Sequence, residues 1–150
     1  MAKSQEKQSK VNFHIHKVYT QDISYESPNS PDTFKEAFQP QVEVDMHTDS
    51  KKLKDEEYEV VLAITITAKS KDKTIFLIEI KQAGVFGIVG TDKDQLEYLL
   101  QGYCPGILFP YVRSLISSVV TRGGFPDINL EPIDFAAMYA RNKAKEQTEA

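Results

Sequence analysis

The chain has 150 residues, a mass of 17.0 kDa, a formal net charge of −4 and 41% hydrophobic residues. This length suits one domain with a single hydrophobic core, and the hydrophobic content excludes a wholly disordered chain. An acidic chain lacks the basic face that duplex nucleic acid or an anionic membrane requires, so neither is expected as the main partner.

The ends of the chain and its single cysteine bear on the compartment. One cysteine, Cys104, cannot form an internal disulfide, and the N-terminal MAKSQEKQSK lacks the apolar core of a secretory signal. No uninterrupted apolar run approaches the roughly 20 residues of a membrane span. We therefore expect a cytoplasmic protein with no membrane insertion. Residues 1–10 and 141–150 are predicted as flexible tails around one domain, 11–140.

The first half of the chain has the alternation of apolar and polar residues that is typical of β-strands. Segment 11–26 alternates but slips in phase at Val18 and Tyr19, which predicts a bulge or a strand crossing. Segment 27–40 contains three prolines and is predicted as an irregular loop. Three further strands are predicted at 41–47, 58–68 and 74–81. Their charged connectors are short, so successive strands are expected to be antiparallel neighbours in a four-stranded meander.

The second half predicts helices. Glycines at 84, 87 and 90 are expected to end the strand pattern, with turns that need positive φ angles. Thr91 or Asp92 is a plausible N-cap for a short helix that ends near residue 103. A main helix is predicted at about 107–122 and a last helix at about 134–146. Strands followed by helices predict an α+β fold, with a long helix on one face of the sheet and a second helix at the C-terminus.

The residues that could carry chemistry give weak signals. No histidine lies near Cys104 in sequence, so a buried, inert thiol is expected there. His14 and His16 share a strand face, yet a lone pair of this kind more often lies in solvent than on a metal. The glycines do not match a phosphate-binding loop, so neither a nucleotide nor another cofactor is expected.

Surface features favour binding over catalysis. Carboxylates on the outer face of the strands, Glu43, Asp45, Glu59 and Glu79, indicate either a polar surface or an acidic docking patch for a basic partner. Serines on one side of the main helix permit close approach, so this helix is expected to pack on a symmetry mate in an obligate oligomer. Aromatic and methionine side chains in the proline-rich loop and the last helix suit loose binding of many sequences.

These segments together resemble the SecB family of bacterial protein-export chaperones, over about residues 13–139. The resemblance rests on VYTQDISYESPNSP at 18–31, FQPQVEVDM at 38–46, YEVVLAITITA at 58–68, FLIEIKQAGVFGIVG at 76–90 and GYCPGILFPYVRSLISSVVTRGGFPDINLEPIDF at 102–135.

The resemblance implies a function without nucleotide or catalysis. It implies a holdase that binds unfolded precursor proteins in the cytosol, keeps them competent for translocation and delivers them to the motor SecA. It also implies a homotetramer, a dimer of dimers, with the long helices held between sheets.

The resemblance also implies roles for particular residues. The expected SecA-docking residues are Asp22, Glu26, Leu77 and Glu79. The expected client-binding residues are Phe38, Val42, Phe135, Met138 and Tyr139. The region expected to support tetramer assembly is Ile78, Ile80 and Gln82.

Two other classes of function remain open from the sequence. One is a small oligomeric enzyme that uses the pair His14 and His16 on a metal ion. The other is a chaperone of this family dedicated to one client, such as an antitoxin. The short C-terminal tail carries two lysines and two glutamates, so the sequence leaves open whether this tail contacts SecA.

Overall fold

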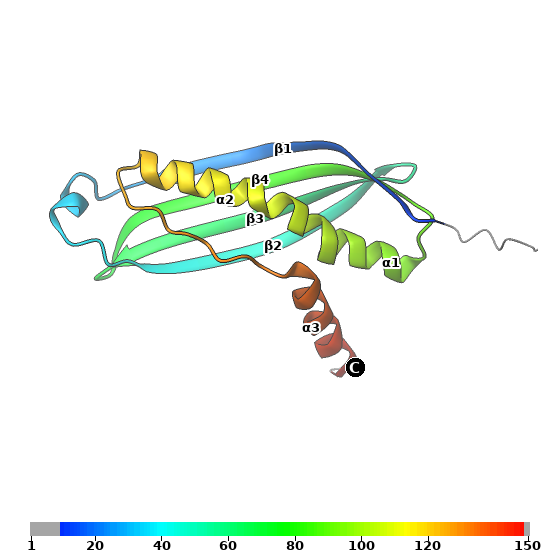
Figure 1. The fold of residues 1–150 in the computed structure, drawn as a ribbon. Coiled ribbons are helices and arrows are strands. Elements are labelled where there is room, and N and C mark those ends of the chain that lie inside the picture. Colours follow the sequence, from blue (N-terminus) through cyan, green and yellow to red (C-terminus); the bar gives the residue numbers. More distant parts are fainter. Residues whose placement is uncertain (1–9, 149–150) are drawn as a thin grey trace, which may run out of the picture.

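The computed structural model describes residues 10–148, which form one antiparallel sheet, a long helix on its face and a C-terminal helix (Figure 1). The predicted N-terminal tail, apart from Lys10, lies outside these residues. The strands are β1 (Asn12–Glu26), β2 (Gln41–Lys54), β3 (Glu57–Ser70) and β4 (Lys73–Val89). The predicted α+β class is therefore confirmed.

The order of the strands in space is β1-β4-β3-β2, and all neighbours are antiparallel. The predicted meander holds for β2, β3 and β4, but the expected pairing of β1 with β2 is wrong. The proline-rich loop after β1 carries the chain to the far edge of the sheet, so β1 pairs with β4 instead. This loop contains one short 3₁₀ helix, η1 (Asp32–Lys35). The prediction of a bulge in β1 is confirmed, but its place is wrong: the register shifts lie between Ile15 and Lys17 and between Thr20 and Asp22, on either side of Val18 and Tyr19.

The strands are longer than the alternation predicts. The charged connector after residue 47 belongs mostly to β2, and the β2–β3 and β3–β4 connections shrink to tight turns. Glu56, Lys71 and Asp72 have positive φ angles in these turns, which suits the twist of a hairpin. Because β2 is an edge strand with exposed side chains, its polar residues do not interrupt it.

The glycines at 84 and 87 lie inside β4 and do not end it. Gly84 faces the long helix: a Cβ atom there would lie 2.7 Å from the ring of Phe86 and 3.2 Å from Leu108. Only Gly90, after the strand, has the predicted positive φ, at 84°. The pattern breaks because the strand needs small residues for close packing, and a turn begins only at its end.

The long helix is continuous from Lys93 to Arg122. Its parts are α1 (Lys93–Tyr98), a π-helical segment η2 (Leu99–Tyr103) and α2 (Cys104–Arg122). The predicted N-cap at Asp92 is confirmed: its carboxylate accepts a hydrogen bond from the backbone N–H of Gln95, whose side chain bonds back to Asp92.

The prediction of two separate helices is wrong, and Pro105 is the physical reason. Proline in a helix removes one hydrogen bond and its ring clashes with the carbonyl four residues before it. The π-helical segment widens the turn at this point, and the N–H of Cys104 bonds to the carbonyl of Leu99. The helix therefore passes through Pro105, and Cys104 lies within it.

The core lies between α2 and the two central strands. Leu108, Val112, Ile116 and Val120 are buried at the four-residue spacing expected of one helix face. They pack on the alternate residues of β3 and β4 that point to the same side, among them Leu62, Ile64, Ile66, Phe76, Ile78, Ile80 and Phe86. By length and composition this helix could cross a membrane, but its buried apolar face makes it the core helix of the domain.

After α2, residues 123–134 form a linker that returns across the sheet toward β2 and leads to α3 (Phe135–Thr148) (Figure 1). The last helix is confirmed, but the prediction that a flexible tail begins at residue 141 is wrong. Residues 141–148 continue the helix, because arginine, lysine, alanine, glutamate and glutamine, which make up most of this segment, are good helix formers.

Candidate client-binding surface and docking face

The helix-side face of the sheet is not fully covered. The α2 part of the long helix lies over β3 and β4, and the part of this helix that mainly approaches β2 is η2, so much of the helix-side face of β2 has no helix above it. Val42 and Val44 are 38% and 46% exposed, and Met46 is half-buried. We call Val42, Val44 and Met46 the apolar strip of β2. Exposed apolar side chains along an edge strand form a surface on which an extended polypeptide can bind.

Aromatic side chains close one end of this strip. The ring of Phe125, at the start of the linker, lies 5.1 Å from Phe34, 5.6 Å from Phe38 and 5.4 Å from Phe76, measured between centroids. Gly124 has φ +89°, and a Cβ atom there would lie 3.1 Å from the ring of Phe34. Stacking on Phe125 thus fixes Phe38 in the loop that leads into β2. The buried Phe125 was not predicted as a site residue, since only its place in this cluster identifies it.

The other end of the strip meets α3. Phe135 is buried, with its ring edge-on to Phe109 at 5.7 Å, while Met138 and Tyr139 are half-buried. A pocket opens between β2 and α3, lined by Met46, His47, Thr48, Gln101, Phe135, Met138, Tyr139 and Asn142. The expected client-binding residues therefore fall in two groups, one at each end, and the helix-side face of β2 joins them.

The expected SecA-docking residues lie together on the opposite face. In the register Glu26 pairs with Leu77, and Glu79 lies opposite Ser24. Because Ile78 and Ile80 face the long helix, Leu77 and Glu79 must face away from it. Asp22 lies one row further along, opposite Lys81.

Two carboxylates of the outer face that are not among the expected SecA-docking residues extend this surface. Glu43 pairs with Thr67 in the row of Leu77, and Asp45 pairs with Thr65 in the row of Glu79. We call the surface of Asp22, Glu26, Glu43, Asp45, Leu77 and Glu79 the acidic face. It combines several carboxylates with one apolar side chain, the composition that favours a basic partner with a small apolar contact.

The residues expected to support assembly are inside the subunit. Ile78, Ile80 and Gln82 are 0%, 1% and 2% exposed, and the hydroxyl of Thr20 donates a hydrogen bond to the side-chain oxygen of Gln82 at 2.8 Å. Their burial under the long helix leaves them no surface for direct contact with a second subunit. Any part they have in assembly must act through the helix that they support.

A polar contact crosses the middle of the outer face. The hydroxyl of Tyr19 on β1 donates a hydrogen bond to the carboxylate of Glu59 on β3, and Lys51 on β2 lies 3.9 Å from the same carboxylate. This bond, with burial, raises the pKa of Tyr19 to about 12. Side chains from three strands are therefore joined across the sheet.

The groups considered for catalysis have no catalytic surroundings. Cys104 is fully buried, and burial raises the pKa of its thiol to about 12, as expected of an inert core cysteine. The rings of His14 and His16 lie 6.5 Å apart on the outer face. Within residues 10–148, no group of three or more His, Cys, Asp or Glu residues is arranged to hold a metal ion.

Comparison with solved structures identifies a fold relative. A SecB-like chaperone of Mycobacterium tuberculosis, Rv1957, solved in complex with a ChAD peptide from the antitoxin HigA1, matches with a TM-score of 0.67 and 15% identity. The match covers 81% of this chain and 90% of that chain. A protein of unknown function from Streptococcus agalactiae is more distant, with a TM-score of 0.44 and 15% identity over 81% of this chain and 98% of that one.

Comparison with protein families gives the assignment. The model of the preprotein translocase subunit SecB matches residues 5–146, which is nearly the whole chain. The resemblance seen in the sequence motifs and the shared fold agree with this match. The chain belongs to the SecB family, whose members are cytoplasmic, non-enzymatic chaperones.

Proposed function

We propose that this chaperone is a general holdase of protein export. It binds unfolded precursor proteins, keeps them competent for translocation and delivers them to the SecA motor. The observation that carries the proposal is the uncovered apolar strip of β2, where Val42 and Val44 are exposed between two clusters of aromatic and methionine side chains.

The strip explains how one surface could bind clients of many different sequences. Each Å² of apolar surface removed from water contributes roughly 25 cal/mol, so a long strip gathers affinity from many weak contacts. Phe38 and Met138 can adapt to different side chains, because ring stacking and the flexible thioether tolerate changes of shape. Binding the unfolded state but not the native one delays folding by mass action, without any nucleotide.

Delivery to SecA is assigned to the acidic face. It lies on the side of the sheet away from the long helix, while the strip lies on the helix side. A motor could therefore dock on one side while the client remains bound on the other. Complementary charge would speed this encounter and fix its orientation.

A homotetramer, as a dimer of dimers, is supported by the outer side of the long helix. Tyr103 and Tyr111 are 47% and 50% exposed there, and Ile107 is half-buried. Ser114, which is exposed, continues the same side and leaves room for a close neighbour. Apolar side chains in a row on a helix indicate a second packing partner, and helices of other subunits would satisfy them.

The proposal is tested with several unrelated denatured proteins, by following their refolding or aggregation with and without the chaperone. Wild type should suppress refolding of all of them, and the pair Val42→Asp with Val44→Asp should lose most of this effect. Val11→Asp is the matched control, since Val11 is equally exposed but lies outside the strip. Unchanged aggregation at an excess of wild type would contradict a holdase.

A second candidate is a chaperone dedicated to one client. It is kept because the solved relative from Mycobacterium tuberculosis was bound to a peptide of an antitoxin. The same experiment separates the two: a dedicated chaperone would suppress refolding of one denatured protein and leave the others unaffected.

A further inference from the structure

The last helix is attached to the rest of the subunit over a small area. Phe135 is its only buried residue among those described, and η2 is the element against which it mainly packs. The linker before it is held by side chains and not by its backbone: within the described chain, residues 126–133 make no backbone–backbone hydrogen bond, while Ile128, Leu130 and Ile133 pack against the core. A helix with little buried surface of its own opens at low free energy.

The helix can nevertheless move as a unit. The carboxylate of Asp134 accepts a hydrogen bond from the backbone N–H of Ala137 at 3.0 Å, and so caps the first turn from within the segment. The helix thus does not depend on the sheet for its N-terminal hydrogen bonds. This cap favours movement of α3 as a helix when it detaches.

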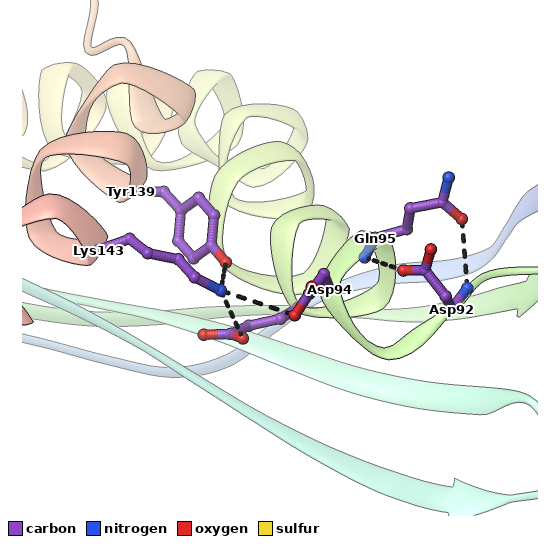
Figure 2. A network of polar contacts seen from close by, with 6 residues as sticks. Asp92, Asp94, Gln95, Tyr139 and Lys143 are labelled. Carbon is purple, nitrogen blue, oxygen red and sulfur yellow. Dashed lines mark hydrogen bonds and ion pairs between the residues drawn. The ribbon is translucent and has the colours of Figure 1, made fainter. Parts of the chain in front are cut away.

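Lys143 of α3 forms ion pairs with two carboxylates of α1. The ammonium of Lys143 lies 3.3 Å from the carboxylate of Glu97, 3.9 Å from that of Asp94 and 3.3 Å from the hydroxyl of Tyr139 (Figure 2). The hydrogen bonds to Tyr139 and Glu97 raise the pKa of Lys143, so the side chain stays charged at neutral pH. Exposed ion pairs are individually weak and sensitive to salt, which suits a contact that must open.

Gly102 in η2 leaves room for the turn of α3 that carries Tyr139. A Cβ atom on Gly102 would lie 3.4 Å from the Cβ of Tyr139 and 3.2 Å from the ring of Tyr98. The rings of Tyr98 and Tyr139 meet edge-on at 5.9 Å. The π-helical segment therefore provides a notch for Tyr139, beside the acidic residues that Lys143 reaches.

We propose that α3 is a latched cover of the client surface, held closed by Lys143 on Asp94 and Glu97. This rests on the proposed function of that surface. Release of the latch lets α3 swing on the linker, which exposes Phe109 and widens the pocket beside Met46. It also presents the apolar side of α3, so a client would gain surface from both. The closed latch then limits binding, because only the open fraction accepts a client in full.

The latch is tested first without any client, by hydrogen exchange of the intact protein. Lys143→Gln should speed the exchange of backbone amides in α3 by about fivefold and leave β4 unchanged. Lys145→Gln is the matched control, because it removes the same charge from the same helix, and within the described chain Lys145 makes no ion pair. The swap Lys143→Glu with Glu97→Lys should recover much of the protection that Lys143→Glu alone loses.

The second readout is affinity for a denatured protein. Lys143→Gln should bind it up to about fivefold more tightly than wild type, and the difference should shrink at high salt, where the wild-type latch is screened. Equal exchange of α3 in Lys143→Gln and Lys145→Gln would overturn the latch, as would faster exchange without tighter binding. Wild type that binds no denatured protein would instead overturn the proposed function, while the exchange rates would still report whether Lys143 holds α3.

Discussion

Tyr19 shows how one side chain can join strands across a sheet. Its hydroxyl reaches Glu59 over the intervening strand β4, where the small, buried Ala83 lies opposite Tyr19 in the register. We expect Tyr19→Phe to lower the free energy of unfolding by about 1 kcal/mol, since the partly buried Glu59 loses a donor. Urea unfolding at neutral pH measures this, and Tyr98→Phe, far from Glu59, serves as the control.

The raised pKa of Tyr19 gives this residue a signature in pH. A group whose pKa is higher in the folded state contributes stability below its unfolded pKa and loses it as pH rises through the folded value. For Tyr19 this window runs from its ordinary pKa of 10.0 to about 12. Wild type should therefore lose more stability than Tyr19→Phe between these two pH values. Parallel curves for the two proteins would contradict the assignment.

The acidic face makes a prediction about SecA. Asp22→Lys and Glu79→Lys should each weaken SecA binding by about 3- to 10-fold at low salt, while binding of a denatured client stays unchanged. Asp55→Lys is the control, because it makes the same change of charge in the β2–β3 turn, away from the acidic face. Binding of SecA by both variants as tight as by wild type would remove the acidic face as the docking site.

At the level of elements, β4 requires glycine for contact with the long helix. Gly84→Ala would press a methyl group on Phe86 and Leu108, and should cost about 1–3 kcal/mol of stability. Gly87→Ala, three residues along the same strand, would meet only the end of the His16 side chain, which can turn away. Urea midpoints should therefore fall more for Gly84→Ala, and a larger fall for Gly87→Ala would show that the close approach of α2 does not limit the packing.

The same elements show what the sequence could predict. Alternation of apolar residues predicted every strand, and helical spacing predicted the buried face of α2, because both patterns follow from local geometry. The residues at which strands and helices begin and end were harder to predict. Pro105 and the β4 glycines are breakers by local rules, but tertiary packing keeps the elements going through them. The pairing of β1 with β4 depends on the path of a long loop, which no local pattern specifies.

For the whole molecule, the two faces of the sheet separate the proposed tasks, and the outer side of the long helix remains for assembly. Tyr111→Glu should shift the proposed tetramer toward smaller species, because assembly through this side of the helix would bury an unpaired charge. Light scattering measures the shift, and unchanged far-UV circular dichroism would show that the fold persists. An assembly of unchanged size in this variant would contradict assembly through the long helix.

Ile78 provides the contrast. It was expected from the resemblance to support assembly, but its side chain is fully buried under the long helix. Ile78→Asp should therefore unfold the subunit, because an unpaired buried charge costs several kcal/mol. Most of the candidate residues lie on strands and helices that the sequence pattern predicted. The pattern could not show which of them lie at a surface, because burial depends on what the long helix covers.

The π-helical segment also fixes the number of residues between the two parts of the long helix. One inserted residue rotates everything before it by about 100° relative to everything after it. That rotation lets the first turns aim Asp94 and Glu97 sideways at Lys143 while the later turns aim leucine and valine down at the strands. Deletion of a single residue between Leu99 and Tyr103 would keep all of these side chains. It would, however, rotate the part of the helix before the deletion, so that Asp94 and Glu97 no longer face Lys143 while the later turns face the strands.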